Sequence, residues 1–509
     1  MQDIIIDGNS LTLEAVGKIA YEKAQIRLSE TSKAKVSKCR DYVDKVIANG
    51  DIVYGLTTGF GKFSTVNIPP DKIAELQVNL IRSHAVSVGE PYSEEITRAI
   101  MLLRIAVLAK GHSGIRLDTL QTLIEMLNKG VHPIIPMRGS VGASGDLSPL
   151  SHLALVLLGE GEAIYGSERL SGSEAMKRAG ITPIVLAAKE GLALNNGTQV
   201  MAAIGALMLL KAEELCRLSD ITAAISIDAL LGTPRAFDPL VHGLRPHPGQ
   251  KISAENLCKL LSDSPLRESH IKCDNVQDAY SLRCTPQVHG AVRDALAYAR
   301  GVLLVEINSA TDNPLIFPDE DKVISGGNFH GEPLAIALDT MALAISELAN
   351  ISERRMEQML NPALSRGLPA FLAKRPGLDS GYMIAQLTAA SLISENKVLS
   401  HPASVDSIPT SANQEDHVSM GSISAIKLLQ VVENVERVIA IELLIGASAL
   451  DYRDHPTSSA LQSVKELLRE KVARLEEDRI LYPDIDAATA LVTSGAILEI
   501  IGKKGPQLY

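Results

Sequence analysis

Apolar residues at helical spacing dominate the second half of the chain. Two segments carry them at intervals of three or four residues, a heptad-like pattern that predicts long helices packed along one seam. Residues 288–309 are expected to form a further helix, and so are residues 221–230 together with the segment before them. Several of these helices are apolar on more than one face, as in the centre of a large bundle or at an oligomer interface. The two seams are formed by Leu334, Leu338, Met341, Ile345 and Leu348, and by Leu428, Val432, Val435, Ile439 and Leu443.

Shorter helices are expected towards both ends of the chain. One is predicted from Asp118, as its N-cap, to Lys129, where Gly130 ends it. Near the C-terminus, the highly charged segment 459–479 predicts a solvent-facing helix.

Aromatic residues are scarce, with 11 Tyr, 6 Phe and no Trp. Because 46% of the residues are nevertheless hydrophobic, the apolar mass must be aliphatic and rich in Ala. Branched and aromatic residues favour strands, whereas Ala, Leu, Met, Glu and Lys favour helices. The composition therefore predicts an all-α protein and argues against a β-sandwich or barrel.

Charge and cysteine content narrow the class of protein. The net charge is −11, from 49 basic and 60 acidic residues, with no basic stripe of the kind that binds nucleic acid. The uncharged stretch 191–210 contains Asn195 and Asn196, which are too polar for a membrane span. The N-terminus is acidic, whereas a signal peptide needs a positive region. We expect a cytoplasmic protein with no nucleic-acid or membrane partner. A disulfide framework and a zinc site are not expected either, because the five cysteines include no CxxC pair: Cys39, Cys216, Cys258, Cys273 and Cys284.

Residues 139–149, Gly-Ser-Val-Gly-Ala-Ser-Gly-Asp-Leu-Ser-Pro, form a glycine-rich loop that matches neither the dinucleotide nor the phosphate-loop pattern. A flexible turn is the common interpretation of such a loop. The tripeptide Ala143-Ser144-Gly145 permits another. Attack of the Gly145 nitrogen on the Ala143 carbonyl, with loss of two waters, one of them from the Ser144 side chain, would give an electrophilic methylidene-imidazolone ring. Glycine suits the attacking position because it has no Cβ, but the tripeptide alone is too common to decide.

Other segments accompany this loop along the whole chain. They are Tyr54-Gly-Leu-Thr-Thr-Gly-Phe-Gly61, Ser83-His84, Leu194-Asn-Asn-Gly-Thr198, Gln277-Asp-Ala-Tyr-Ser-Leu-Arg283, Thr311-Asp-Asn-Pro314, Gly326-Gly-Asn-Phe-His330 and Asn413-Gln-Glu-Asp-His-Val-Ser419. With them the chain resembles the aromatic amino acid ammonia-lyases, and among these the histidine-specific members. That family carries a 4-methylidene-imidazol-5-one (MIO) group. The resemblance therefore implies an MIO formed from Ala143, Ser144 and Gly145, with no external cofactor.

The resemblance also implies roles for residues around the ring. Tyr54 would remove the β-proton, and its loop would act as a lid, although Tyr54 by itself would be taken to anchor a turn. Tyr280 would assist near the ring or orient the substrate. Asn196 would hydrogen-bond the ring oxygen or the developing charge, although an Asn-Gly pair is also an ordinary turn signal. Asp146 would help ring formation, or else it would only cap the following helix.

Further residues would bind the substrate. Arg283 would clamp its carboxylate through two N–H donors, unless it forms a surface ion pair. His84 and Glu415 would meet the imidazole. Glu415 discriminates better, because a tyrosine-specific relative can also carry a histidine where His84 stands. Which of Tyr54 and Glu415 takes the proton stays open. The set is completed by Gln277 and Asn313, as hydrogen-bonding groups, and Phe329, as an apolar wall near the ring.

These roles imply the non-oxidative elimination of ammonia from L-histidine to give trans-urocanate, the first step of histidine degradation. The implied architecture is a long-helix central bundle of the fumarase/aspartase-like type at 111–450. An N-terminal, mostly helical region at 1–110 would carry the lid and His84, and a C-terminal helical layer would cover 451–509. A homotetramer with active sites shared between subunits is expected.

Alternatives remain at this point. A tyrosine ammonia-lyase or an aromatic amino acid aminomutase would use the same electrophile. A non-catalytic helical scaffold is the alternative from another class, and the intact Ala143-Ser144-Gly145, Tyr54 and Arg283 argue against it. No functional metal is expected, because the twelve histidines are scattered and form no HExxH pattern.

Overall fold

The computed structural model describes residues 3–271 and 276–509, which divide into two compact units. Unit 1 contains Met1–Leu210, Ala299–Asp339 and Pro402–Ile426. Unit 2 contains Lys211–Tyr298, Thr340–His401 and Lys427–Tyr509. The sequence predicts consecutive regions with boundaries near residues 110 and 450, whereas each unit combines three separate segments. The predicted division therefore stays a prediction.

Helices dominate the described residues, so the all-α prediction is confirmed. The long helices are α9 (Gln199–Ala229), α14 (Thr285–Glu306), α15 (Glu332–Leu360) and α17 (Gly421–Leu450), and each contributes residues to both units. Both predicted heptad-like seams lie on α15 and α17, and every residue of these seams is buried. The helix expected at 221–230 and in the segment before it is α9, which ends at Ala229.

Unit 1 is built around α4 (Glu94–Leu108), whose residues from Ile96 onward are all buried. It packs against α1 and α5, while α3, α6 and α8 pack against one another. Serine and threonine side chains cap several helices, for example Ser93 on α4. The remaining helices of this unit are α1 (Leu13–Tyr21), α2 (Glu30–Ala48), η1 (Gly61–Phe63), η2 (Pro70–Lys72), α3 (Ile73–His84), α5 (Leu117–Lys129), α6 (Leu147–Leu157), α7 (Gly172–Arg178), α8 (Glu190–Asn195), η4 (Pro318–Glu320) and η6 (Ser411–Asn413).

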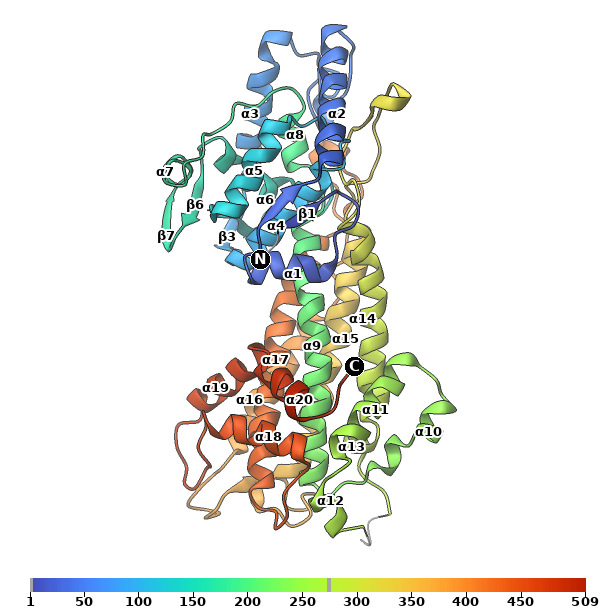
Figure 1. Ribbon diagram of the computed structural model, residues 1–509, viewed down its shortest axis with the longest axis vertical. Coiled ribbons are helices and arrows are strands. Elements are labelled where there is room, and N and C mark those ends of the chain that lie inside the picture. Colours follow the sequence, from blue (N-terminus) through green and yellow to red (C-terminus); the bar gives the residue numbers. More distant parts are fainter. Residues whose placement is uncertain (1–2, 272–275) are drawn as a thin grey trace. The chain divides into compact units, whose positions relative to one another are not determined.

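The strands are short and lie in unit 1. The parallel pair β1–β2 and the antiparallel sheets β3–β5, β4–β6–β7 and β8–β9 have two to four residues in each strand. Figure 1 shows β6 and β7 beside α7, which they contact. The bounds are β1 (Ile4–Ile6), β2 (Ile26–Leu28), β3 (Val88–Pro91), β4 (His132–Pro133), β5 (Pro136–Arg138), β6 (Glu162–Tyr165), β7 (Glu168–Ser171), β8 (Leu315–Phe317) and β9 (Lys322–Ile324).

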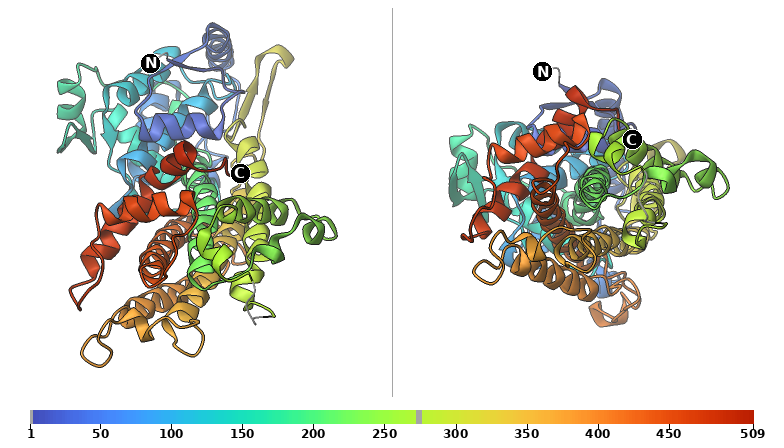
Figure 2. Two further views of the ribbon diagram at one scale, coloured as in Figure 1. Left: turned by 60° about the horizontal axis from the view of Figure 1, so that its bottom comes forward. Right: turned by 90° about the horizontal axis from the view of Figure 1, so that it is seen from below.

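Buried polar groups connect the long helices within unit 2. The Glu442 carboxylate on α17 accepts hydrogen bonds from Thr222 and Ser226 on α9 and from Ser352 on α15, and it pairs with Arg355 on α15. Each charge is thereby compensated where water does not reach it. The right-hand view of Figure 2 shows α9, in green, end-on among neighbouring helices. The other helices of unit 2 are η3 (Pro234–Phe237), α10 (Pro239–Gly243), α11 (Pro248–Leu261), α12 (Pro265–Ser269), α13 (Tyr280–Arg283), η5 (Ala370–Leu372), α16 (Met383–Leu399), α18 (Ser459–Arg469), α19 (Tyr482–Thr493) and α20 (Ala496–Lys504).

Two local predictions are wrong. The N-cap of α5 is Arg116, and Asp118 lies in the first turn, where its charge complements the helix dipole. Gly130 does end α5, with a left-handed φ of 77°. The charged segment 459–479 is not one helix, because α18 ends at Arg469 and buries Leu461, Val464 and Leu468 on one face. The charged residues of this segment lie on one face of a short helix and in the loop that follows it.

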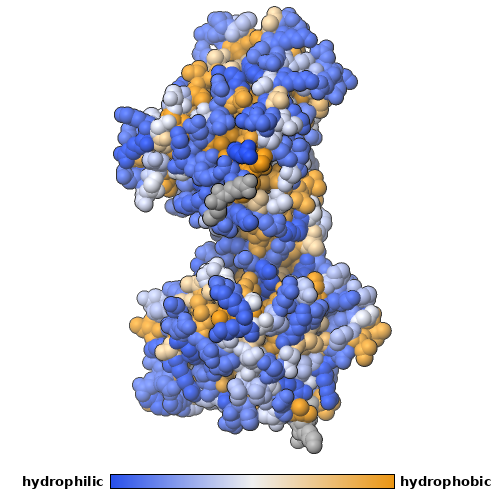
Figure 3. Space-filling view, in the orientation of Figure 1, coloured by the Kyte–Doolittle hydropathy of each residue, from blue (hydrophilic) through white to orange (hydrophobic). Residues whose placement is uncertain are grey.

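Among the described residues, α15 is the one single helix long and apolar enough to cross a membrane, and the α19–α20 pair, bent by 60°, would be a second candidate. Inside the protein, 72% of the apolar part of α15 is buried, as in the core helix of a soluble protein. The face drawn in Figure 3 is mostly hydrophilic, with patches of exposed hydrophobic residues. Cys39, Cys216, Cys258 and Cys284 are free, and Cys273 lies outside the described residues.

Candidate active site

The loop before α6 takes a shape that requires glycine at position 145. Gly145 has a φ of 69° and forms a bridge with Gly197. A Cβ at this position would stand 2.1 Å from the Gly197 carbonyl oxygen, so no other residue fits. The preceding Ala143 is almost fully buried, and it packs against Val418 and Met420. The tripeptide is therefore held on both sides by distant parts of unit 1.

Asp146 joins this loop to the beginning of α9. Its carboxylate accepts hydrogen bonds from the Val200 and Met201 N–H groups at 2.9 and 3.1 Å, and from the Ser422 hydroxyl at 3.1 Å. Its own N–H donates to the Gly197 carbonyl at 2.6 Å. Asp146 does occupy the N-cap position of α6, but its side chain makes no capping hydrogen bond to that helix. Burial raises the pKa of this carboxyl to about 7, although the hydrogen bonds oppose the shift.

Asn196 ends α8 and points its amide at the loop. Its Nδ2 donates to the Ser144 carbonyl oxygen at 3.2 Å. Its Oδ1 is buried and has no hydrogen-bond partner among the described residues. The Asn-Gly pair does make a turn between α8 and α9, but the side chain also contacts the tripeptide, so both interpretations of Asn196 apply.

Glu415 comes from a separate loop and reaches the serine of the tripeptide. The Ser144 hydroxyl donates to its Oε1 at 2.8 Å, and the Thr410 and Ser411 hydroxyls donate to its Oε2 at 2.6 and 2.9 Å. The loop is held by backbone hydrogen bonds between residues 410 and 415. Ser411, Ala412 and Asn413 have φ values of 52°, 53° and 69°, a left-handed turn made without glycine.

His84 is the last residue of α3 and lies within the electrostatic range of Glu415. Burial lowers the pKa of His84, while a hydrogen bond with the Leu80 backbone and the negative charge of Glu415 act in the opposite direction. Its Nδ1 lies 3.0 Å from the Ser83 hydroxyl. His84, Glu415 and Ser144 are therefore brought to one part of unit 1.

Tyr54 and its glycine-rich loop lie next to the loop of Glu415. The Tyr54 hydroxyl accepts a hydrogen bond from the Gly61 N–H at 3.2 Å, so the ring does anchor the turn. The short helix η1, which starts at Gly61, contacts η6, which lies just before Glu415. An anchoring role and proton acceptance are compatible, because the bond from Gly61 uses one lone pair of the phenol oxygen and leaves another for a proton.

Asn313 and Phe329 occupy the two ends of a second supporting loop in unit 1. The Asn313 Oδ1 accepts from Ser325 Oγ at 3.1 Å and from the Gly326 N–H at 2.8 Å, so this side chain holds the loop that leads to Phe329. Phe329 is partly buried. Two residues later, the Gly331 N–H donates to the Gly142 carbonyl, which ties this loop to the tripeptide region.

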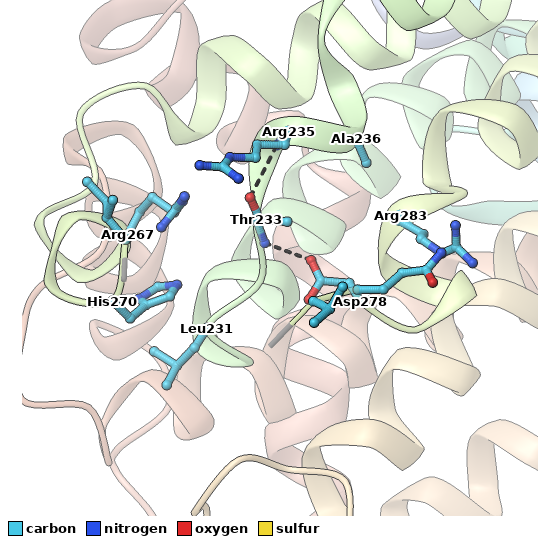
Figure 4. A pocket seen from close by; sticks show the side chains of 11 residues that line it. Leu231, Thr233, Arg235, Ala236, Arg267, His270, Asp278 and Arg283 are labelled. Atoms are coloured by element: carbon cyan, nitrogen blue, oxygen red, sulfur yellow. Dashed lines mark hydrogen bonds between the residues drawn. The ribbon is translucent and has the colours of Figure 1, made fainter. Parts of the chain in front are cut away.

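Gln277, Tyr280 and Arg283 belong to unit 2. The Gln277 amide oxygen accepts two hydrogen bonds from the Arg283 guanidinium, which also lies 4.5 Å from the centre of the Tyr280 ring. Gln277 and Arg283 line a pocket of about 310 Å³ that is rich in cations (Figure 4). Tyr280 is exposed. The three side chains therefore form one group, in a different unit from the tripeptide.

One group of described residues has the composition of a metal site. Ligand atoms of His330, Glu332 and His417 lie within 4.8 Å of one another. Both ring nitrogens of His330 are already engaged, one with the His417 carbonyl at 3.2 Å and the other with the Glu332 N–H at 3.3 Å. Among the described residues, the chain's own groups thus already occupy the ring nitrogens of His330, one of which would have to offer its lone pair to a metal.

A model of the aromatic amino acid lyase family matches residues 11–470, which is most of the chain. The chain belongs to this family. A histidine ammonia-lyase from Caldanaerobacter subterraneus subsp. tengcongensis is 56% identical over 511 residues, covering 100% of both chains. The structure of histidine ammonia-lyase from Trypanosoma cruzi is 48% identical, with a TM-score of 0.92 over 99% of this chain and 96% of that one. Tyrosine aminomutase from Streptomyces globisporus is 37% identical, with a TM-score of 0.94 over 100% of both chains.

The structure of this lyase also reveals polar residues that sequence analysis did not single out. Thr410 and Ser411 orient Glu415, but in the sequence they are two hydroxyl residues in an ordinary polar loop. Arg104 lies under Asn196, and its signal was available, since a charged residue interrupts the apolar run 100–108. Such a residue is buried only with partners, which made it a candidate for a structural or functional role.

Proposed function

We propose that this lyase is a histidine ammonia-lyase, which eliminates ammonia from L-histidine to give trans-urocanate. The observation that carries the proposal is the Glu415 carboxylate, hydrogen-bonded to Ser144 at 2.8 Å and acting electrostatically on His84. A carboxylate at this place can accept the N–H of an imidazole, which a phenyl ring cannot offer. The full-length similarity to histidine ammonia-lyases supports the same substrate.

The prosthetic group in this proposal is an MIO formed from Ala143, Ser144 and Gly145. The fit is supported by the missing Cβ at Gly145, by the Asn196 amide on the Ser144 carbonyl and by the unpartnered Asn196 Oδ1. The group would supply an electrophile that binds the substrate amine and makes it a better leaving group. Asn196 would hold the ring from the α8 side, and the Asp146 N–H bond to Gly197 would keep the loop in place. Phe329 would cover the ring as an apolar wall.

The chain's own residues would then perform the proton transfer and binding. Tyr54 would take the β-proton at its phenol oxygen, since its loop lies beside that of Glu415. Glu415 would accept the imidazole N–H, with its second oxygen fixed by Thr410 and Ser411 so that the carboxylate cannot rotate. His84 would face the same imidazole from α3.

The substrate carboxylate would be bound by Arg283, whose guanidinium is planar and supplies paired donors. Gln277 already orients that guanidinium, and Tyr280 stacks on it. Asn313 would add a hydrogen bond, although in this structure its oxygen serves the loop at 325–326.

In this proposal the enzyme is a cytoplasmic homotetramer in which the 277–283 segment of one subunit completes the site of another. The residues of the proposed site are divided between units 1 and 2, which agrees with such an arrangement. Apolar side chains are also exposed on the unit 2 parts of α15 and α16, where a neighbouring subunit would cover them: Leu343, Ile384, Leu387 and Val398.

The test is product analysis with histidine and tyrosine as competing substrates, together with the mass of the intact chain. We expect urocanate and ammonia from histidine and a mass lower by two waters. Ser144→Ala should abolish both signals, whereas Ser167→Ala, at an exposed serine in the β6–β7 turn, should change neither.

Other outcomes identify the alternatives. Exclusive turnover of tyrosine, to an elimination product or a β-amino acid, would replace this proposal by the lyase or aminomutase of the other specificity. A folded protein with the full mass and no turnover of either amino acid would indicate the non-catalytic scaffold.

A further inference from the structure

Arg104 is a fully buried cation in the C-terminal half of α4, and it contacts the turn between α8 and α9. Its Nη1 donates to the Asn196 carbonyl oxygen at 2.6 Å and to Gln199 Oε1 at 2.8 Å. Its exposed fraction is 0%. Nε and Nη2 have no hydrogen-bond partner among the described residues. A charge is rarely buried in this way without a function or a strong partner, since desolvation is unfavourable by several kcal/mol.

The counter-charge that acts on Arg104 is already engaged elsewhere. Asp312 acts on Arg104 only through the electrostatic field, because its carboxylate pairs with Lys189 at 2.9 Å in the same buried region. Burial lowers the pKa of Arg104 to about 10, so the guanidinium stays protonated at neutral pH. Its hydrogen bonds therefore go to neutral oxygens of the α8–α9 turn, and not to a carboxylate.

The turn held by Arg104 makes two of the contacts that hold the tripeptide and the residue after it. Asn196 donates from its amide to the Ser144 carbonyl, and Gly197 accepts from the Asp146 N–H at 2.6 Å. Arg104 also touches Gly197 closely, because a Cβ there would lie 2.9 Å from Nη1. Gln199, its second acceptor, donates in turn to Thr311 Oγ1 at 2.6 Å. Arg104 thus connects α4, the α8–α9 turn and the loop that begins at Thr311.

We infer that Arg104 is a positioning residue of the catalytic loop, which holds Asn196 and Gly197 in register with Ser144 and Asp146. The inference rests on the proposed function for its activity readout. Arg104 does not touch the reacting atoms in this scheme. The Arg104 guanidinium holds the backbone carbonyl of Asn196. This fixes the backbone from which the side-chain amide of Asn196 reaches Ser144.

The experiment compares Arg104→Met with Arg98→Met. Arg98 is a matched control, because it is a second buried arginine on α4 and binds the carbonyls of Ile19 and Leu127, away from the loop. Arg104→Lys keeps the charge but loses the planar fork. For each variant we would measure the thermal midpoint, the fraction of chains that have lost two waters, and kcat and KM per chain that has lost them.

Arg104→Met should lower the fraction with the two-water loss, and it should lower kcat about 10- to 100-fold in the chains that retain it, because displacements of about 1 Å have effects of this size. KM for histidine should stay within about twofold, since Arg104 is remote from the imidazole-binding groups. Arg104→Lys should recover part of kcat. Arg98→Met should reduce the thermal midpoint only.

Two results would overturn the inference. One is a folded Arg104→Met protein with normal two-water loss and normal kcat. The other is an equal loss of kcat in Arg98→Met, which would reduce the effect to general stability. Failure of the proposed function looks different, since then the unchanged protein would itself lack the two-water loss and turn over no histidine.

Discussion

Replacing Gly145 by alanine tests how tightly the tripeptide is built into the fold. Alanine in a left-handed conformation is disfavoured by about 1–2 kcal/mol relative to its usual backbone. At φ 69° this applies to Gly145, and the new Cβ would also overlap the Gly197 carbonyl oxygen at 2.1 Å. Residues 145 and 197 must then separate, which leaves the buried Asp146 N–H without its acceptor.

An unsatisfied buried N–H is unfavourable by about 1–3 kcal/mol. The sum is a loss of about 2–5 kcal/mol in the free energy of unfolding. Gly166 provides the matched control: it has a φ of 64°, lies in the β6–β7 turn and has no atom within 4 Å of its added Cβ. Gly166→Ala should therefore lose only the backbone part, about 1–2 kcal/mol.

The assay is urea unfolding followed by helical circular dichroism, combined with the mass of the intact chain. Gly145→Ala should lose clearly more stability than Gly166→Ala and should keep its full mass, whereas Gly166→Ala should lose two waters. Equal stabilities and an equal two-water loss in the two variants would refute the reasoning, because the contact with Gly197 would then contribute nothing to the free energy of unfolding.

Three further outcomes follow from the site. Tyr54→Phe should keep the two-water loss but reduce histidine turnover by about 10²–10⁴-fold, the usual contribution of a general base; near-normal single-turnover rates would contradict this. Asp146→Asn should remove a pH dependence of stability, because a carboxyl with a pKa of 3.8 when unfolded and about 7 when folded loses about 4 kcal/mol of stability as the pH rises between these values. If the free energies of unfolding of the original protein and of Asp146→Asn change in parallel from pH 4 to 8, the Asp146 pKa is not raised. Glu415→Gln should raise KM for histidine by about 10- to 100-fold, the value of a charged hydrogen bond, with little effect on any residual tyrosine turnover; an equal change for both substrates would argue against imidazole recognition.

The helical body of the protein was predictable because its signal is repeated. The seams at Leu334–Leu348 and Leu428–Leu443 each combine five residues, so one exception would not have hidden them. Single-residue signals were weaker. Asp118 has the chemistry of an N-cap, but the helix begins earlier, at Leu117, with Arg116 as its cap. Tertiary packing decides where such helices begin, and the local sequence does not show that packing.

Partners that are distant in the sequence were not predictable from local pattern. The Asp146 carboxylate looks like a cap for the next helix, yet it binds N–H groups 54 and 55 residues later. The contact between Ser144 and Glu415 spans 271 residues. Resemblance to a family brought Ser144 and Glu415 into one hypothesis, but it said nothing of Thr410, Ser411 or Arg104, whose roles depend on where the backbone passes.

The left-handed turn before Glu415 has a consequence for engineering. Ser411 and Ala412 adopt a backbone that disfavours them by about 1–2 kcal/mol each, and the hydroxyl groups that converge on the carboxylate offset this strain. Glycine at Ala412 would relax the turn and make the protein more heat-resistant, the usual aim of a consensus-style redesign. The same change would hold the Glu415 carboxylate less firmly, so a gain in heat resistance at this turn would reduce the selectivity between amino acids.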